Sequence, residues 1–209
     1  AHHIVHAEEI RVGAGEARNA AILNLDLRGF TALAESCPPD AVMRLLADYQ
    51  ATMVPIIRRH GGSIDKFLGD GIMATFGASS TRAGYAADAL ACVADILDAA
   101  EAWSARRAAQ GLPVRSVNAA VASGRVVFGA VGEKDRLEYT VIGNPVNLAA
   151  KLEKHNSVLG SRAVTTATTF AEARQQGYQP AAEPRRVSQA RVEGVSQPVD
   201  LVVLADAQT

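Results

Sequence analysis

The chain has 209 residues, 48% of them hydrophobic, and a formal net charge of -1. This length suits one domain with a sizeable core, and the near-neutral charge gives no electrostatic basis for binding nucleic acid or an anionic membrane surface. The two cysteines lack metal-ligand spacing, which suits a reducing compartment. The sequence has no run of roughly 20 apolar residues, so it predicts no membrane-spanning segment. We therefore expect a cytoplasmic domain, even if the full-length protein is anchored to a membrane.

The first predicted strand ends in a charged residue. Residues 1–19 are polar and contain glycine, and we interpret them as a lead-in or linker. Residues 20–26 form an apolar run that predicts a buried strand ending at Asp26. Gly-Phe-Thr at 29–31 then opens a helical pattern, so backbone N–H groups at a helix start follow the acid. Such groups are suited to binding phosphate oxygens.

A helix and a hairpin come next along the chain. Residues 40–60 carry apolar side chains at helical spacing, between proline and glycine signals. The segment SIDKFLGDGIMATFG, residues 63–77, predicts two strands around a turn that contains Asp70 between two glycines. If this hairpin lies beside the first strand, Asp26 and Asp70 emerge at one sheet edge, where Mg²⁺ can be held by carboxylates and substrate phosphates. Taken alone, each acid is explained equally well as a cap or a turn former.

The second half of the chain predicts another long helix followed by strands. Residues 83–110 are alanine-rich and helical in pattern. RSVNAAVASGRVVFGAVG, residues 115–132, predicts two strands with a turn at Ser123-Gly124. A charged stretch at 133–138 precedes a short strand and a helix that opens at Asn144 with proline in its first position.

The order of elements predicts the fold class. The chain ends in a weaker pattern of a short strand, a small helix and a terminal strand pair. Hairpins mixed with long helices favour an α+β fold, with a largely antiparallel sheet and helices on one face. We expect one domain over residues 20–205, followed by a short tail at 206–209.

Four motifs together resemble those of one enzyme family. LDLRGFT, GGSIDKFLGDGIMATFG, GRVVFGAVG and YTVIGNPVNLAAKLE occur in the order found in the catalytic domains of class III adenylate and guanylate cyclases. The resemblance runs from about residue 20 to residue 204. It implies a ferredoxin-like α+β fold and a head-to-tail homodimer with active sites across the interface. It also implies two Mg²⁺ or Mn²⁺ ions per site and fusion to a regulatory domain.

The resemblance assigns metal and phosphate roles to one end of the first strand. Asp26 and Asp70 match the two metal-binding aspartates, and the carbonyl of Leu27 is implied as a further ligand. Arg125 matches an arginine that contacts the phosphates. The residues that match the turn around the triphosphate are Gly29, Phe30 and Thr31.

The resemblance also assigns the residues that select the base, orient the ribose and stabilise the transition state. Lys66 matches the position that selects the base, where lysine goes with adenine because an ammonium group only donates hydrogen bonds. Thr140 matches its partner selector, often aspartate. Asn147 matches the residue that orients the ribose. Lys151 stands where the family uses arginine, and it keeps the charge without the planar fork. The terminal segment has only Arg191 where many members place a phosphate-binding lysine.

These assignments predict an adenylate cyclase that converts ATP to 3′,5′-cyclic AMP and pyrophosphate. The resemblance implies that both acids come from one chain. It implies that Lys66, Thr140, Asn147 and Lys151 come from its partner. A guanylate cyclase is the nearest alternative and is disfavoured by Lys66. A catalytically weak, nucleotide-binding regulatory domain is a second alternative, suggested by Lys151. A polymerase-like palm would share the paired acids but would not explain Lys66 together with Asn147.

Overall fold

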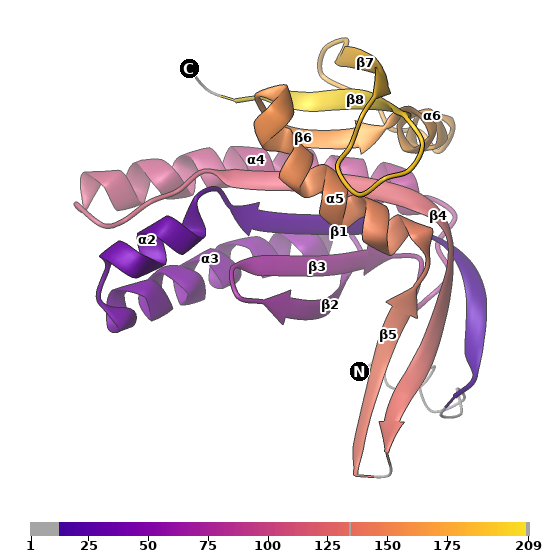
Figure 1. The fold of residues 1–209 in the computed structure, drawn as a ribbon, viewed down its shortest axis with the longest axis horizontal. Helices are drawn as coiled ribbons and strands as arrows, with labels where there is room; N and C mark the ends of the chain where they lie inside the picture. Colours follow the sequence, from indigo (N-terminus) through magenta and orange to yellow (C-terminus); the bar gives the residue numbers. More distant parts are fainter. Residues whose placement is uncertain (1–12, 134, 208–209) are drawn as a thin grey trace.

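The computed structural model describes residues 13–133 and 135–207 and is built on one eight-stranded sheet (Figure 1). The strand order is β2-β3-β1-β4-β6-β8-β7, with β5 paired to β4. Among the described strands all pairs are antiparallel except β4 with β6. The strands are β1 (Gly15–Leu27), β2 (Ser63–Leu68), β3 (Gly71–Phe76), β4 (Val117–Glu133), β5 (Arg136–Ile142), β6 (Ser161–Thr166), β7 (Arg185–Ala190) and β8 (Val199–Asp206).

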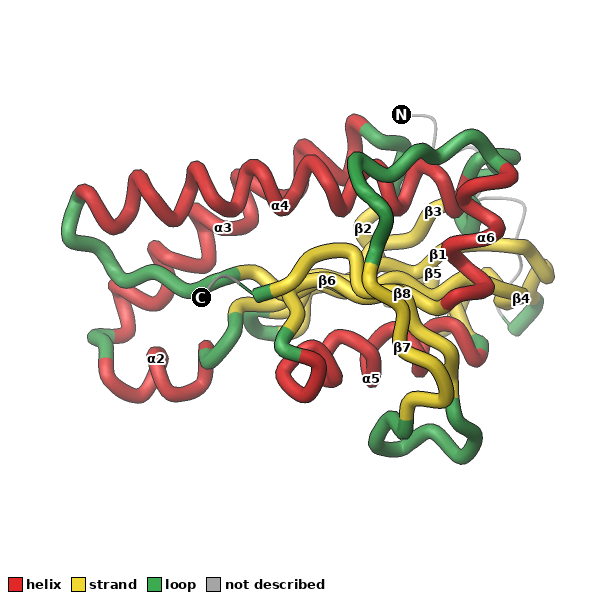
Figure 2. Tube along the Cα trace, turned by 90° about the horizontal axis from the view of Figure 1, so that it is seen from above, coloured by secondary structure: helices red, strands yellow, loops and turns green. Residues whose placement is uncertain are grey.

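Helices cover both faces of this sheet (Figure 2). The five helices of the described residues are α2 (Phe30–Ser36), α3 (Pro39–Arg59), α4 (Tyr85–Ala109), α5 (Asn144–Leu159) and α6 (Ala167–Gln175). The expected arrangement on one face holds for α3, α4 and α6, whereas α5 packs on the opposite face. β1 explains the difference, because residues 20–23 are all buried and successive side chains point to opposite faces. None of the helices in the described part of the chain is long and apolar enough to cross a membrane.

β1 begins earlier than the sequence pattern predicted. The strand starts at Gly15, so residues 15–19 belong to the folded domain and not to the lead-in. This polar segment is held by β4, which pairs with β1 from Gly15 opposite Gly129 to Leu27 opposite Val117. The prediction for residues 1–12 lies outside the described residues.

β4 is one continuous strand, so the predicted turn at Ser123-Gly124 is wrong. A side chain added at Gly124 would approach Pro145 at the start of α5 to 3.1 Å. The backbone N–H of Ser123 donates to Thr169 Oγ1 on α6 at 3.0 Å. Small residues are therefore needed at positions 123 and 124 because α5 and α6 pack closely against the two sides of the strand.

The end of β4 and β5, joined along part of their length by the start of β1, form a ribbon that projects from the sheet (Figure 1). Of the predicted charged stretch at 133–138, Glu133 is the last residue of β4 and residues 136–138 begin β5. Several large apolar side chains on the ribbon are exposed, and we call them the ribbon surface: Val127, Val131, Leu137 and Ile142.

Candidate active site

β1 and the β2–β3 hairpin bring Asp26 and Asp70 together at one end of the sheet. β3 pairs with β1 up to Ile72 opposite Leu25, so the turn before β3 lies beside the end of β1. The backbone N–H of Leu27 donates to Asp70 Oδ2 at 3.0 Å. Burial raises the pKa of Asp70, the Leu27 N–H opposes this shift, and the negative charge of Asp26 adds to it.

Asp26 lies in a buried cluster of oxygen atoms. Its Oδ1 is buried and accepts no hydrogen bond from an N–H or hydroxyl group in the described part of the chain. Glu153 on α5 is only 6% exposed and makes hydrogen-bonding contact with Asp26. Burial, this contact and the charge of Asp26 together raise the pKa of Glu153 to about 9. A buried carboxylate oxygen of this kind is stabilised either by a proton on a neighbouring acid or by a cation.

The donor set fits a hard divalent cation. The β4 residue opposite Asp26 is Asn118, whose Oδ1 is likewise buried without a partner among the described residues. In the same part of the chain no group of three or more His, Cys, Asp or Glu side chains is arranged to hold a metal ion. Carboxylates of Asp26 and Asp70 would therefore share an ion with main-chain oxygen, such as the Leu27 carbonyl, and with substrate phosphates.

The turn after Asp26 leads directly into α2. Gly29 is the residue before the helix and has φ 70°, in the left-handed region that favours glycine. Phe30 packs against the core, and Thr31 is exposed at the first helical turn. The N–H groups of a first helical turn have no partner within the helix, which suits them to phosphate oxygens.

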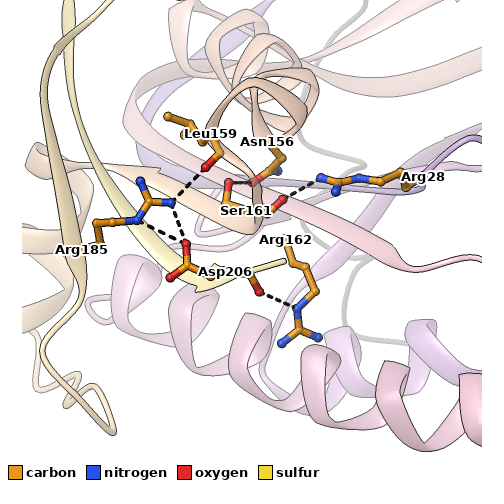
Figure 3. A network of polar contacts seen from close by, with 7 residues as sticks. All are labelled: Arg28, Asn156, Leu159, Ser161, Arg162, Arg185 and Asp206. Atoms are coloured by element: carbon orange, nitrogen blue, oxygen red, sulfur yellow. Dashed lines mark hydrogen bonds and ion pairs between the residues drawn. The ribbon is translucent and has the colours of Figure 1, made fainter. Parts of the chain in front are cut away.

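A polar network fixes this turn to the end of α5 (Figure 3). The Arg28 guanidinium donates to the Ser161 carbonyl at 2.7 Å, and the Ser161 hydroxyl donates to Asn156 Oδ1 at 2.7 Å. The Asn156 amide donates to the Ala119 carbonyl on β4 at 2.9 Å. Asn156 is fully buried, so it ties α5 to the strands that carry the acids.

Lys66 and Thr140 line one hollow, although they lie 74 positions apart in the chain. The hollow measures about 440 Å³, and its other lining residues are Asp65, Glu138 and Tyr139. It forms where β2 lies near β5. The structure therefore brings the two predicted base-selecting residues together.

Asn147 and Lys151 line a second hollow of about 350 Å³. One turn of α5 separates them, so both side chains lie on one face of the helix. The loop between β7 and β8 forms the other wall, and Lys151 Nζ donates to the Gly194 carbonyl at 2.5 Å. The structure brings both residues to one hollow, and their assigned roles stay predictions.

Comparison with known proteins identifies the family. Residues 12–198 match the family model of the adenylate and guanylate cyclase catalytic domain. The chain belongs to this family. The predicted family and the α+β fold class are thereby confirmed.

The curated relatives of this cyclase domain include two adenylate cyclases. An adenylate cyclase of Anabaena cylindrica is 39% identical over 150 residues, which is 70% of this chain and 29% of that protein. Adenylate cyclase 1 of Rhizobium meliloti is 30% identical over 147 residues, 70% of this chain and 22% of that protein. The chain thus spans less than a third of these curated relatives.

Two solved cyclase structures share the whole fold. The guanylyl cyclase Cya2 superposes with a TM-score of 0.81 at 30% identity, covering 93% of this chain and 95% of that chain. The adenylyl cyclase CyaB from P. aeruginosa has a TM-score of 0.80 at 28% identity, covering 93% and 97%. Since one of these enzymes is named for guanylate and the other for adenylate, the shared fold is compatible with either base.

The cyclase domain separates its predicted site residues into groups. Among the described residues, neither Asp26 nor Asp70 lines the hollow of Lys66 or the hollow of Lys151. Arg125 is also apart from the acids, because it pairs with Asn19, seven residues before Asp26 on β1. At about 3.4 Å per strand residue, this separation is about 24 Å. One protomer therefore does not bring Arg125 to the acids, and its phosphate contact stays a prediction.

Two residues of this cyclase site were not predicted from the sequence. Glu153 carries a detectable signal, since it lies four residues after buried Ala149 and next to buried Leu152, on the apolar stripe of α5. An acid on such a stripe indicates a special partner. Asn118 gives no such signal, because its importance depends on the register that places it opposite Asp26.

Proposed function

We propose that this domain is an adenylate cyclase that converts ATP to 3′,5′-cyclic AMP and pyrophosphate. The observation that supports ATP over GTP is the hollow shared by Lys66 and Thr140. The side chain of Lys66 is 43% exposed there, so its ammonium group is open to a ligand. Three N–H donors and no acceptor suit the ring nitrogens of adenine, which only accept hydrogen bonds.

The metal-binding half of the site holds the triphosphate. Asp26 and Asp70 would hold Mg²⁺ or Mn²⁺, two ions per site, which when bound lower the pKa of the ribose 3′-hydroxyl and neutralise phosphate charge. The first N–H groups of α2, after Gly29, would donate hydrogen bonds to the phosphate oxygens. The polar network at Arg28 keeps this turn in place.

The second half of the site orients the ribose and the α-phosphate. The Asn147 amide would hydrogen-bond the ribose and align its 3′-hydroxyl for attack at the α-phosphorus in line with the leaving pyrophosphate. Lys151 would stabilise the negative charge that develops on the α-phosphate oxygens. A single ammonium group does this less well than a bidentate guanidinium group.

We propose that these halves meet across a homodimer. The acids and the nucleotide-binding hollows are separate in one protomer, so a second copy would complete each site. The ribbon surface offers exposed apolar side chains for this contact. Since the chain spans under a third of its curated relatives, we further propose that a regulatory domain is fused to it in the whole protein.

The decisive test is a product assay on the purified domain. ATP or GTP is supplied with Mg²⁺ or Mn²⁺ over a series of protein concentrations, and cyclic nucleotides are separated by chromatography. We expect cyclic AMP, with a specific activity that rises with protein concentration because the site needs two copies. Absence of any cyclic product at high protein concentration with Mn²⁺ would refute the enzyme proposal.

The second candidate function is guanylate cyclisation. The observation that favours it is the likeness to Cya2, a guanylyl cyclase with 30% identity. Cyclic GMP as the main product in the same assay would establish this alternative.

A third candidate is nucleotide binding without turnover. The observation that favours it is the hydrogen bond that holds Lys151 to Gly194. Binding of a fluorescent ATP analogue without formation of a cyclic product would establish it.

A further inference from the structure

The strand that carries Lys66 is irregular at the residue before it. β2 pairs with β3 in one register at Ile64, opposite Ala74, and in a shifted register at Lys66, opposite Met73. Asp65 is thus the extra residue of a β-bulge. In a regular strand neighbouring side chains point to opposite faces, and a bulge re-aims the side chains at its position.

The bulge allows Asp65 to reach its neighbour. Asp65 Oδ2 lies 3.4 Å from Lys66 Nζ, and both residues line the hollow that also contains Thr140. The side chain of Asp65 is 6% exposed, whereas that of Lys66 is 43% exposed. The carboxylate is therefore enclosed in the wall of the hollow, whereas the lysine side chain is partly open to solvent.

Lys66 is the one cation that forms an ion pair with Asp65 in the part of the chain that the structure describes. Its Oδ2 is buried and makes no hydrogen bond among the described residues. Burial raises the pKa of Asp65 and the charge of Lys66 opposes that shift, while the carboxylate of Glu138 adds to it. The Lys66 ammonium is thus the group that offsets the cost of a buried carboxylate.

We propose that Asp65 is a positioning residue for base selection, which holds the Lys66 ammonium group at the hollow. A free lysine side chain has four rotatable bonds, and an ion pair to a fixed, buried carboxylate limits where its ammonium group lies. The ammonium group is then held by the charge of Asp65, and its N–H groups remain for acceptor atoms of the base. This inference rests on the proposed adenylate specificity and extends it to a residue that acts through Lys66.

The test compares ATP with GTP in Asp65→Asn, which keeps the size of the side chain and removes its charge. We expect kcat/KM for ATP to fall about tenfold, mainly through KM, because a charge-assisted contact is lost. Activity with GTP should change little, so the ATP/GTP ratio should also fall about tenfold. If the role of Asp65 were purely structural, kcat/KM would fall equally for ATP and GTP, and that result would overturn the proposal.

A double-mutant cycle isolates the path through Lys66. Lys66→Met should lower the ATP/GTP ratio, and adding Asp65→Asn to it should cause no further change. An equal extra loss in the double variant would show that Asp65 does not act through Lys66. Asp48→Asn is the matched control, since Asp48 also pairs with a cation, Arg107 at 2.9 Å, but on α3 and away from the hollow.

The cycle also separates this inference from the proposed function. If Lys66→Met leaves the ratio unchanged, adenine selection by Lys66 is wrong, and the inference fails with it. If Lys66→Met changes the ratio and Asp65→Asn does not, only the inference fails. For variants with low turnover, the affinities of fluorescent ATP and GTP analogues give the preference for ATP over GTP. If thermal unfolding shows that Asp65→Asn is misfolded, Asp65→Ser takes its place.

Discussion

Asp26 carries the largest chemical consequence of any single side chain in the site. Asparagine at position 26 has the same shape but no charge, so it cannot support a divalent cation as a carboxylate does. We expect Asp26→Asn to lower cyclic AMP formation by at least about 10²–10³-fold. The melting temperature should stay the same or rise, because like charge beside Asp70 is removed. Asp40→Asn, in an exposed pair with Arg44, is the control and should keep full activity.

Glu153 makes the stability of the metal-free domain depend on pH. Burial and Asp26 raise its pKa to about 9, from an ordinary value of 4.5 in the unfolded chain. Between these values the folded state holds one more proton than the unfolded state, so the free energy of unfolding falls as pH rises, by up to about 1.4 kcal/mol per pH unit. Urea unfolding in EDTA from pH 5 to pH 8 should show a shallower fall for Glu153→Gln. An equal fall in the free energy of unfolding for the wild type and Glu153→Gln would contradict this prediction.

At the scale of elements, α5 is fixed to the sheet by the side chain of Asn156. Asn156→Ala would remove the acceptor of the Ser161 hydroxyl and one donor to the Ala119 carbonyl, both in a buried region. We expect the free energy of unfolding to fall by about 2–4 kcal/mol, measured by urea unfolding. Ser157→Ala, at the next and exposed position, should change it by less than about 0.5 kcal/mol.

Elements with local signals were predictable from the sequence, and contacts between distant elements were not. The hairpin around Asp70 combines apolar strands with a Gly-Asp-Gly turn, and it forms where expected. Ser123-Gly124 carries the same local signal for a turn but lies inside β4, because Pro145 and α6 pack against it. The pairing of Glu153 with Asp26 depends on α5 crossing β1, and no local pattern reports that crossing.

At the scale of the whole molecule, the proposed homodimer predicts rescue between inactive variants. Asp26→Asn damages the metal-binding half of a site, and Asn147→Ala damages the nucleotide-binding half. Mixed dimers would place both defects in one site and leave the other intact, so an equal mixture should recover about a quarter of the wild-type activity. The measurement is cyclic AMP formation before and after mixing. No recovery, with dimers present by sedimentation, would exclude a shared site.

The continuous course of β4 has a mechanical consequence for such a dimer. The strand begins beside Asp26, at Val117 and Asn118, and ends at Glu133 in the ribbon, a span of about 55 Å at strand spacing. It pairs with β1 from Val117 to Gly129, and its end continues in the ribbon beside β5 as far as Glu133. In the proposed dimer, a small rotation of one copy against the other, applied at the ribbon, would be carried along β4 to the acids without any element unfolding. An input domain would then control turnover by setting an angle between two copies, without touching the nucleotide.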